Sequence, residues 1–320
     1  MITTGTVTHR GVFYDTLMLT RLLPNLLHGL FAQIRDVPKN RGNVIRFRRY
    51  NNMTVVTDPL VEGVTPTATA LTVTDVNATL YQYGAFVEHT DVILDTVEDP
   101  YLDELTQLIA EHGGQSLDTI TREVLVAGTA VQYASTATSR GTVSPAMLFT
   151  LAEAREAVRT LKGNNVKKIT RMQMPNGNID TIPGNACFVA LVHPNTTYDL
   201  KDEADFVPVE LYPSQTDILP GEVGRMDEIR FIESTYASAF EDEGLAAEDV
   251  YPTLIFGADA YGVSRITTKE FELINHPPGS AGSADPLNQR GTNAWKAWFT
   301  AVILQQTAML RVEHGCSIDA

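Results

Sequence analysis

The most basic stretch of the chain is the segment KNRGNVIRFRRY, which covers residues 39–50. It holds Arg46, Arg48 and Arg49 in a protein whose formal net charge is −15. Guanidinium groups at this spacing could bind nucleic acid, another negatively charged ligand, or an acidic patch on a second copy of the chain. Because the whole protein is acidic, its field repels phosphate backbones, which argues against sequence-independent binding of nucleic acid over a large surface. A local basic strip can still bind a smaller anionic partner.

The sequence lacks the common catalytic and cofactor-binding motifs: it has no P-loop, GxGxxG, HExxH, GxSxG or EF-hand loop. Its seven histidines are scattered, and no two have the i, i+3 or i+4 spacing of a helical metal site. His112 stands near Ser116 and Asp118. A serine in the middle of a helix, however, lacks the strained turn and the hydrogen-bond donors that activate a nucleophile. We therefore predict no catalytic residue, no cofactor and no metal.

Two further groups of residues could carry chemistry. The acidic run EDEGLAAED at residues 241–249 could offer oxygen ligands to Ca²⁺, but it lacks the alternating ligand spacing of a calcium loop and predicts a solvated acidic surface. Cys187 and Cys316 lie far apart without a CxxC partner, which favours a reducing compartment. Charged residues interrupt residues 1–30, and no apolar run reaches the length of a membrane span. These features predict a soluble protein of the cytoplasm.

The elements that would position the arginines begin with an arm and a ribbon. Six leucines at helical spacing, interrupted by Pro24, predict an N-terminal helix: Leu19, Leu22, Leu23, Leu26, Leu27 and Leu30. This helix would pack on its own core or lie across a neighbouring molecule. Residues 43–56 and the Val- and Thr-rich runs after them predict a long two-stranded ribbon with Arg46 and Arg48 on one face. Because an isolated hairpin is marginal in water, we expect the ribbon to lie on another surface.

A long helix is predicted over residues 99–128, with Asp99 as N-cap and Pro100 in its first turn. One side carries an apolar stripe formed by Leu102, Leu105, Ile109, Leu117, Ile120 and Val124. The other side is predicted to be exposed and acidic, with Asp103, Glu104, Glu111, Asp118 and Glu123. Gly113 and Gly114 in the middle predict a bend.

The remainder alternates helical and strand-like patterns. A second helix is predicted at 144–162, capped by Ser144, and a tight hairpin at Asn176–Gly177. The run CFVALV at 187–192 predicts a buried strand, followed by a short helix after Pro194. The last third, including the segment from Trp295 onward, is predicted to be mainly strands.

Several stretches together resemble one known family. They are FYDTLMLTRLLPNLLHGLF, PKNRGNVIRFRRY followed by PLVEGVTP, LVHPNTTYDLKD, GEVGRMDEIRFIES, YPTLIFGADAYG and SADPLNQRGTNAWKAW. In type, order and spacing they resemble the major capsid proteins of tailed bacteriophages with the Hong Kong 97-type (HK97-type) fold, and among them the branch that includes phage N4. None of these stretches is a catalytic motif, so the resemblance rests on their succession along nearly the whole chain.

The resemblance implies an α+β fold in five segments: an N-terminal arm at 1–36, an extended β-ribbon or E-loop at 37–90, a P-domain with a long spine helix at 91–130, an α/β A-domain at 131–260, and return strands of the P-domain at 261–320. It implies a structural protein without enzymatic activity. Copies would assemble in the host cytoplasm into hexamers and pentamers of an icosahedral virion shell around double-stranded DNA, without sequence-specific DNA binding or membrane contact. Further partners would be a portal at one vertex, scaffolding proteins and decoration proteins.

The resemblance also suggests what the basic ribbon binds. If the ribbon lies across the next copy, Arg46, Arg48 and Arg49 could face the acidic side of that copy's long helix, which carries Asp103, Glu104 and Glu111. Each exposed ion pair is worth only about 0–1 kcal/mol, so these pairs would set register while apolar burial supplies most of the binding energy. The alternative is a soluble multi-domain enzyme, or a binding module that grips a polyanion with residues 39–50.

Overall fold

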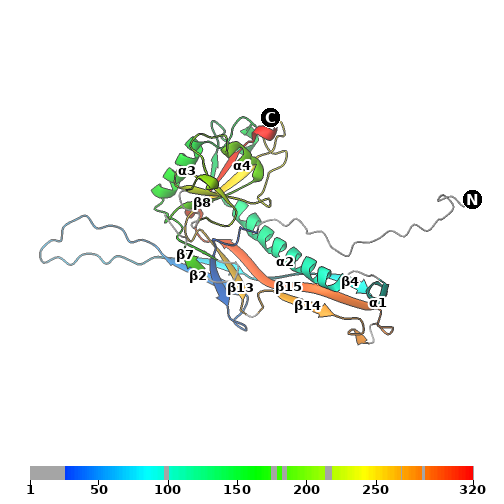
Figure 1. The fold of residues 1–320 in the computed structure, drawn as a ribbon. Helices are drawn as coiled ribbons and strands as arrows, with labels where there is room; N and C mark the ends of the chain where they lie inside the picture. The colour runs from blue at the N-terminus through cyan, green and yellow to red at the C-terminus, as the bar shows by residue number, and fades with distance from the viewer. Residues whose placement is uncertain are drawn as a thin grey trace, which may run out of the picture.

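The computed structural model describes residues 26–96, 101–173, 179–181, 186–212, 218–267, 269–282 and 285–319. These residues form three parts: a rounded body that holds the C-terminus, an elongated part in which a long helix lies along a sheet, and a thin ribbon that projects away from both (Figure 1). No helix within the described ranges is long and apolar enough to cross a membrane.

The helices are α1 (Asp91–Thr96), α2 (Tyr101–Val126), α3 (Leu151–Gly163) and α4 (Pro194–Leu200). The strands of the ribbon and the elongated part are β1 (Gln33–Val37), β2 (Val44–Tyr50), β3 (Val73–Thr79), β4 (Tyr81–Thr90), β13 (Tyr261–Ile266), β14 (Glu272–His276) and β15 (Arg290–Ile303). The other strands are β5 (Val131–Tyr133), β6 (Arg171–Gln173), β7 (Ile179–Thr181), β8 (Phe188–Val192), β9 (Val207–Pro208), β10 (Glu222–Met226), β11 (Ile229–Glu233), β12 (Tyr251–Phe256) and β16 (Met309–His314).

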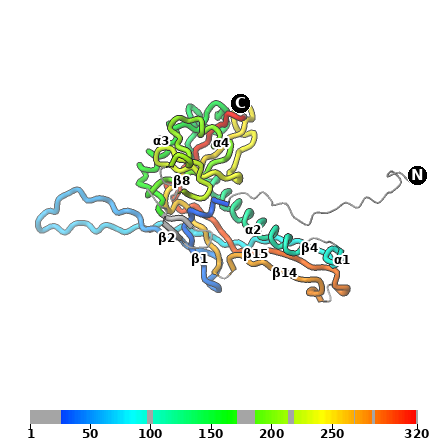
Figure 2. The backbone as a smooth tube through the Cα atoms, in the orientation of Figure 1, coloured from blue at the N-terminus to red at the C-terminus, as the bar shows by residue number. Residues whose placement is uncertain are grey.

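The elongated part is built around β15. On one edge β15 pairs antiparallel with β4 along the whole length of β4, and on the other edge it pairs with β13 and β14, while β1 adds to β13 in parallel. Helix α2 lies along this sheet (Figures 1 and 2). Trp295 and Ala297 alternate toward the helix and pack against Leu105 and Ile109, as period-two and helical spacing require.

The glycines of α2 serve close packing. The helix runs without interruption through Gly113 and Gly114, where the sequence predicted a bend. A Cβ atom on Gly113 would overlap the ring of Phe271 and lie 3.1 Å from the indole of Trp295, which stack on each other with ring centroids 5.6 Å apart. The absence of a side chain therefore lets the helix approach the sheet.

We expect Gly113→Ala to lower the free energy of unfolding by about 1–3 kcal/mol, because overpacking outweighs the gain of about 1 kcal/mol in helix propensity. Urea unfolding of the dissociated subunit measures the change. Gly163→Ala is the matched control, since a Cβ there would have no heavy atom within 4 Å. A Gly113→Ala protein as stable as the control protein would contradict the packing argument.

The body contains a seven-stranded sheet in the order β5-β16-β12-β8-β11-β10-β9. Every residue of β8 is buried, which confirms the predicted buried strand, and its side chains alternate between two cores. Phe188 and Ala190 pack on the side of α3, whereas Val189 and Leu191 pack on the side of the N-terminal segment and the end of α2.

The second helix begins later than the sequence predicted. Residues 144–150 are not helical, and α3 starts at Leu151 with Thr150 as its N-cap. The reason is tertiary: Phe149 is 1% exposed and packs edge-on against Phe231, with ring centroids 5.7 Å apart. The non-helical backbone before Leu151 places the ring of Phe149 in this core. A helix starting at Ser144 would not place it there.

The N-terminal leucines that the structure describes do not lie in the predicted helix. Residues 28–32 form turns, and β1 follows them. Leu27 and Phe31 are buried in the core of the body, so this part of the chain packs on its own molecule. The rest of the predicted helix lies outside the described residues, as do Asp99, Pro100, Asn176 and Gly177. The strands β6 and β7 on either side of that Asn-Gly pair are antiparallel partners, as a hairpin requires.

His314 lies fully inside the body. Its Nε2 atom lies 2.9 Å from Thr253 Oγ1, and its Nδ1 atom lies 2.8 Å from the carbonyl oxygen of Gly315. Because a carbonyl only accepts, Nδ1 carries the proton and Nε2 accepts from the hydroxyl. Burial lowers the pKa of His314 to about 4.

Stability should therefore fall in acid. The pKa of His314 in the folded protein lies below the value of 6.5 for a free histidine. The stabilisation that its neutral ring contributes to the folded state is therefore fully present above pH 6.5 and is lost as the pH falls toward 4. The expected slope is about 1.4 kcal/mol per pH unit. Between pH 7 and pH 4.5 the free energy of unfolding should decrease in both proteins. We expect this decrease to be smaller in His314→Gln than in wild type by about 2–3 kcal/mol. Equal losses in the two proteins would show that His314 does not titrate on unfolding.

The predicted ribbon is confirmed as a two-stranded structure. β2 and β3 pair antiparallel from Val44 with Thr79 to Tyr50 with Val73. The next strand, β4, leaves the ribbon and joins β15 in the elongated part. Beyond the paired strands the chain forms an open loop that extends away from the body (Figures 1 and 2).

Candidate functional site

The predicted arginines of the ribbon already have partners on their own chain. The strand places Arg46 and Arg48 on one face, and the antiparallel register places Asn77 and Asp75 opposite them. Arg46 Nε donates to Asn77 Oδ1 at 3.1 Å, and Arg48 Nε donates to Asp75 Oδ1 at 3.0 Å. Arg46 Nη1 also lies 3.5 Å from Asp75 Oδ2. The hydrogen bond from Arg48 lowers the pKa of Asp75.

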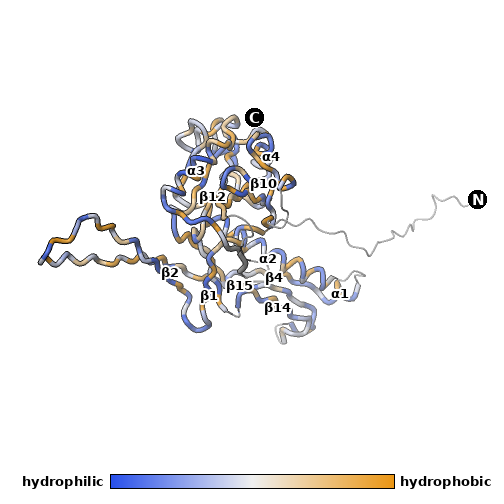
Figure 3. Tube along the Cα trace, turned by 60° about the vertical axis from the view of Figure 1, so that its left-hand side comes forward, coloured by the Kyte–Doolittle hydropathy of each residue, from blue (hydrophilic) through white to orange (hydrophobic). Residues whose placement is uncertain are grey.

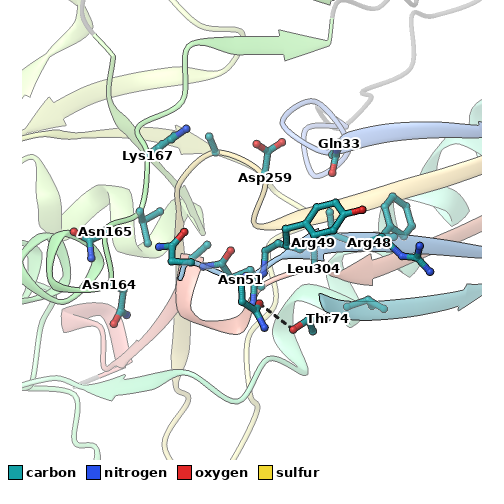
Figure 4. Close-up of a pocket in the computed structure, with 18 residues that line it drawn as sticks. Gln33, Arg48, Arg49, Asn51, Thr74, Asn164, Asn165, Lys167, Asp259 and Leu304 are labelled. Atoms are coloured by element: carbon teal, nitrogen blue, oxygen red, sulfur yellow. Dashed lines mark hydrogen bonds between the residues drawn. The ribbon is translucent and has the colours of Figure 1, made fainter. Parts of the chain in front are cut away.

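Arg49 points into a different environment. It lines a cavity of about 580 Å³ between the base of the ribbon and the body, together with Asn51, Lys167 and Asp259 (Figure 4). Within the described part of the chain, Arg49 makes no hydrogen bond or ion pair. Of the three predicted arginines, it is therefore the one that makes no polar contact within the ribbon.

The acidic side of α2 is shorter than predicted. Asp103 is exposed, and Glu104 and Glu111 are partly exposed, with Glu111 accepting a hydrogen bond of 2.9 Å from Gln107. Asp118 was predicted on this exposed side, and that is wrong, because it is 7% exposed. The ribbon and the acidic half of α2 lie at opposite ends of the molecule (Figure 1). One chain therefore does not bring them together, and their pairing between two copies remains a prediction.

Asp118 instead binds the segment that enters the body. One carboxylate oxygen accepts the backbone N–H of His28 at 3.0 Å, and the other lies 2.7 Å from His28 Nδ1. Tyr261 donates its hydroxyl to the carbonyl oxygen of His28 at 2.5 Å. His28 is fully buried, so the chain is fixed at this point to the middle of α2 and to β13.

The far end of α2 is fixed by buried charges. Arg140 donates two hydrogen bonds to Glu313, at 2.9 and 2.8 Å, and a third to Glu243. Arg311 lies 2.8 Å from the same Glu313 carboxylate and donates to the carbonyl oxygens of Val126 and Gly128. The side chain of Glu313 is fully buried. This network ties the C-terminal end of α2 to β16 in the body.

The loop of the ribbon exposes many apolar side chains. The following are between 57% and 81% exposed: Met53, Val55, Val56, Leu60, Val61, Val64 and Leu71. Figure 3 shows hydrophobic stretches along both sides of this loop. A soluble monomer rarely exposes so many apolar side chains in one continuous segment, which marks the loop as a contact surface.

The residues considered for catalysis have structural roles. His112 Nδ1 accepts a hydrogen bond of 3.0 Å from Trp295 Nε1. Ser116 Oγ donates 2.7 Å to the carbonyl oxygen of His112 in its own helix. Among the residues that the structure covers, no cluster of three His, Cys, Asp or Glu side chains could hold a metal ion.

The internal partner Asp75 and the buried charge of Asp118 were not identified from sequence. The signal for Asp75 was available: once β2 and β3 are paired antiparallel, an acid in VTDVNAT falls opposite an arginine. Asp118 gave no such signal, because its partner His28 lies 90 residues away.

Comparison with solved structures shows the fold. The chain is similar to a chain of the capsid of Ralstonia phage GP4, with a TM-score of 0.74 and 10% identity over 99% of this chain and 98% of that one. It is also similar to a chain of the cyanophage Pam1 capsid, with a TM-score of 0.71 and 14% identity over 99% and 98%. A chain of the cyanophage P-SCSP1u capsid gives a TM-score of 0.71 and 10% identity over 99% and 97%.

Sequence comparison identifies the family. The chain is 25% identical over 249 residues to the major capsid protein of Pseudomonas phage KPP21, an alignment that covers 69% of this chain and 62% of that protein. The chain thus spans less than two thirds of that relative's length. Residues 72–312 match the phage capsid protein family, and this match covers β3 of the ribbon, β4, α2 and nearly all of the body, but not β1 or β2. The chain belongs to the phage capsid protein family.

Proposed function

We propose that this chain is the major capsid protein of a tailed phage and that it assembles with copies of itself into the hexamers and pentamers of an icosahedral shell around double-stranded DNA. The observation that carries the proposal is the ribbon loop, whose apolar side chains are more than half exposed on the single chain. A surface of this kind gains stability when a partner covers it. A shell of many copies supplies one partner for each ribbon.

The proposed domain assignment follows the resemblance to HK97-type proteins of the phage N4 branch. The arm would cover 1–36, the E-loop 37–90, the P-domain with its spine helix 91–130, the A-domain 131–260 and the returning P-domain strands 261–320. The ribbon formed by β2 and β3, the length of α2 and the seven-stranded sheet of the body support this assignment.

The proposed role is structural rather than enzymatic. The virion capsid would be its location and the host cytoplasm its place of assembly, with a portal, scaffolding proteins and decoration proteins as further partners. The net charge of −15 suits a container that encloses DNA without binding its sequence. The polyanion-binding alternative is weakened, because Arg46 and Arg48 are matched by Asn77 and Asp75 within the ribbon.

Electron microscopy of the concentrated, purified protein tests the proposal. We expect closed shells, isolated capsomers or tubes. Discrete small oligomers at every concentration and salt condition would contradict it.

A separate variant tests the charge pairing between copies. We combine three substitutions, Arg46→Glu, Arg48→Glu and Asp75→Arg. They keep opposite charges paired within the ribbon but reverse the net charge of these three positions from positive to negative. We expect this triple variant to fold normally and to lose shell formation. Mixing it with Asp103→Lys, Glu104→Lys, Glu111→Lys subunits should restore mixed hexamers in which the two kinds alternate, and microscopy and co-sedimentation detect them. Normal shells from the triple variant alone would refute the pairing.

A further inference from the structure

A polar cavity separates the base of the ribbon from the body. Its volume of about 580 Å³ lies within the range of about 300–1,000 Å³ that is usual for small-molecule sites. Arg49 and Asn51 line this cavity from the ribbon, whereas Asn165 and Lys167 line it from the body (Figure 4). Two parts of the molecule that lie far apart in the sequence therefore face one space.

The lining of this cavity has an excess of positive charge. Neither Arg49 nor Lys167 makes a hydrogen bond or an ion pair through its side chain with another described residue. Arg48 also lines the cavity, but it is bonded to Asp75. Among the described residues that line the cavity, Asp259 is the one carboxylate, and it is in no ion pair. In a protein whose net charge is −15, two unmatched cations at one cavity mark a place where an anion is attracted.

The donors of the cavity suit an anion with several oxygen atoms. Arg49 presents a planar fork of N–H groups, and Lys167 presents three rotatable N–H groups. The side-chain amides of Asn52 and Asn165 make no hydrogen bond with another described residue, and each carries two further N–H donors. A carboxylate has two oxygen atoms and one charge, so it would leave most of these donors unused. A phosphate group offers three acceptor oxygens and up to two charges.

The body side of the cavity is held in place before any ligand binds. The backbone of Asn165 has a φ of 57° and that of Asp259 a φ of 58°, in the left-handed region that asparagine and aspartate tolerate better than other side chains. The N–H of Ala258 donates to the carbonyl oxygen of Lys167 at 2.8 Å, which fixes these two turns side by side. Unusual backbone conformations of this kind cluster at ligand-binding sites, where a fixed wall lowers the cost of binding.

We propose that this cavity binds the phosphate groups of a small molecule, with Arg49 holding the ligand from the ribbon and Lys167 holding it from the body. Inorganic pyrophosphate and the phosphate chain of a nucleotide share this chemistry. Because the two cations belong to different parts of the molecule, the bound ligand ties the base of the ribbon to the body. This inference goes beyond the proposed function and is independent of assembly, since a single chain forms the cavity.

Calorimetric titration of the dissociated subunit with pyrophosphate tests the proposal. The buffer is low in salt, because dissolved ions screen exposed cations. We expect Arg49→Gln and Lys167→Gln each to weaken binding at least tenfold, since each removes a charge and its hydrogen bonds. Arg41→Gln is the matched control: Arg41 is exposed near the start of β2 but does not line the cavity, so its variant should bind as wild type does. Absence of binding by wild type at millimolar pyrophosphate, or equal affinity in all three variants, would overturn the proposal.

Asp259→Asn gives a test of the opposite sign, which a folding defect cannot imitate. The substitution removes the negative charge that repels a phosphate, and asparagine adopts the same left-handed backbone. We expect pyrophosphate to bind at least twofold more tightly to this variant than to wild type. An unchanged or weaker affinity would show that the anion binds elsewhere.

Parallel titrations with ADP and adenosine distinguish the two sources of the phosphate. Equal affinities for pyrophosphate and ADP would show that the phosphate chain alone is recognised. Tighter binding of ADP would support a nucleotide, whose base would lie beside Phe47 and Tyr50 in the lining. Adenosine binding as tightly as ADP would overturn the proposal, because the phosphates would then contribute nothing.

Hydrogen exchange tests whether the ligand joins the ribbon to the body. We expect pyrophosphate to slow exchange both in residues 47–52 of the ribbon and in residues 164–167 of the body. The Arg49→Gln variant should lose the protection in both segments. Protection of only one segment in wild type would refute the bridging role. None of these outcomes bears on self-assembly, which the microscopy described above tests separately.

Discussion

Glu313→Gln will lower the free energy of unfolding by about 3–5 kcal/mol. The substitution keeps the shape of the side chain but removes the negative charge that Arg140 and Arg311 share. Because Glu313 is fully buried and Arg311 is nearly so, the guanidinium group of Arg311 would be left without a counter-charge in a place that water does not reach, whereas Arg140 is partly exposed and keeps its bond to Glu243. The C-terminal end of α2 should loosen from the body as a result.

Denaturant unfolding of the dissociated subunit measures this effect, and the same network provides its control. Glu243 also accepts from Arg140, but its side chain is 51% exposed. We expect Glu243→Gln to cost less than about 1 kcal/mol, as for other surface ion pairs. If the two variants were equally stable, the network would not be the anchor described above.

Val55→Asp combined with Val56→Asp will abolish shell formation while leaving the subunit folded. These side chains are 81% and 75% exposed in the single chain, so the change has no folded contact to break. Burying each valine in an assembly is worth about 1.5–3 kcal/mol, and a buried unpaired carboxylate adds a penalty. A loss of about 3–6 kcal/mol per copy raises the concentration needed for assembly by at least about a hundredfold.

Light scattering during assembly gives this concentration, and circular dichroism checks the fold. Val55→Ile with Val56→Ile is the matched control: it keeps the loop apolar and should assemble near the wild-type concentration. Shells formed by the double aspartate variant at that concentration would show that the loop does not bury these residues.

The sequence predicted the elements whose pattern is local. The continuous apolar run CFVALV predicted a buried strand, and the arginine strand followed by Val- and Thr-rich runs predicted the ribbon. Both predictions were confirmed, because a short apolar run marks a strand buried on both faces and a two-residue period reports which side chains share a face. The long helix was predicted to end at residue 128 and it ends at Val126, since its apolar stripe from Leu102 to Val124 spans nearly the whole helix.

Predictions failed where a distant contact decided the outcome. Ser144 and Pro145 have the composition of a helix start, yet Phe149 must reach Phe231, and this contact delays the helix to Leu151. Asp118 has the spacing of an exposed acid, yet His28 draws it into the interior. The pairing of β4 with β15 is likewise not visible in the sequence, because the two strands lie about 200 residues apart and nothing local to either one specifies its partner.

The anchoring of His28 has a mechanical consequence. The backbone N–H, the side chain and the carbonyl group of this one residue are each held, by Asp118 and by Tyr261. A pull on the chain at this point would therefore be resisted by three hydrogen bonds of a single residue. Asp118 would pass the load to α2 and Tyr261 would pass it to β13, so that two elements of the fold share it.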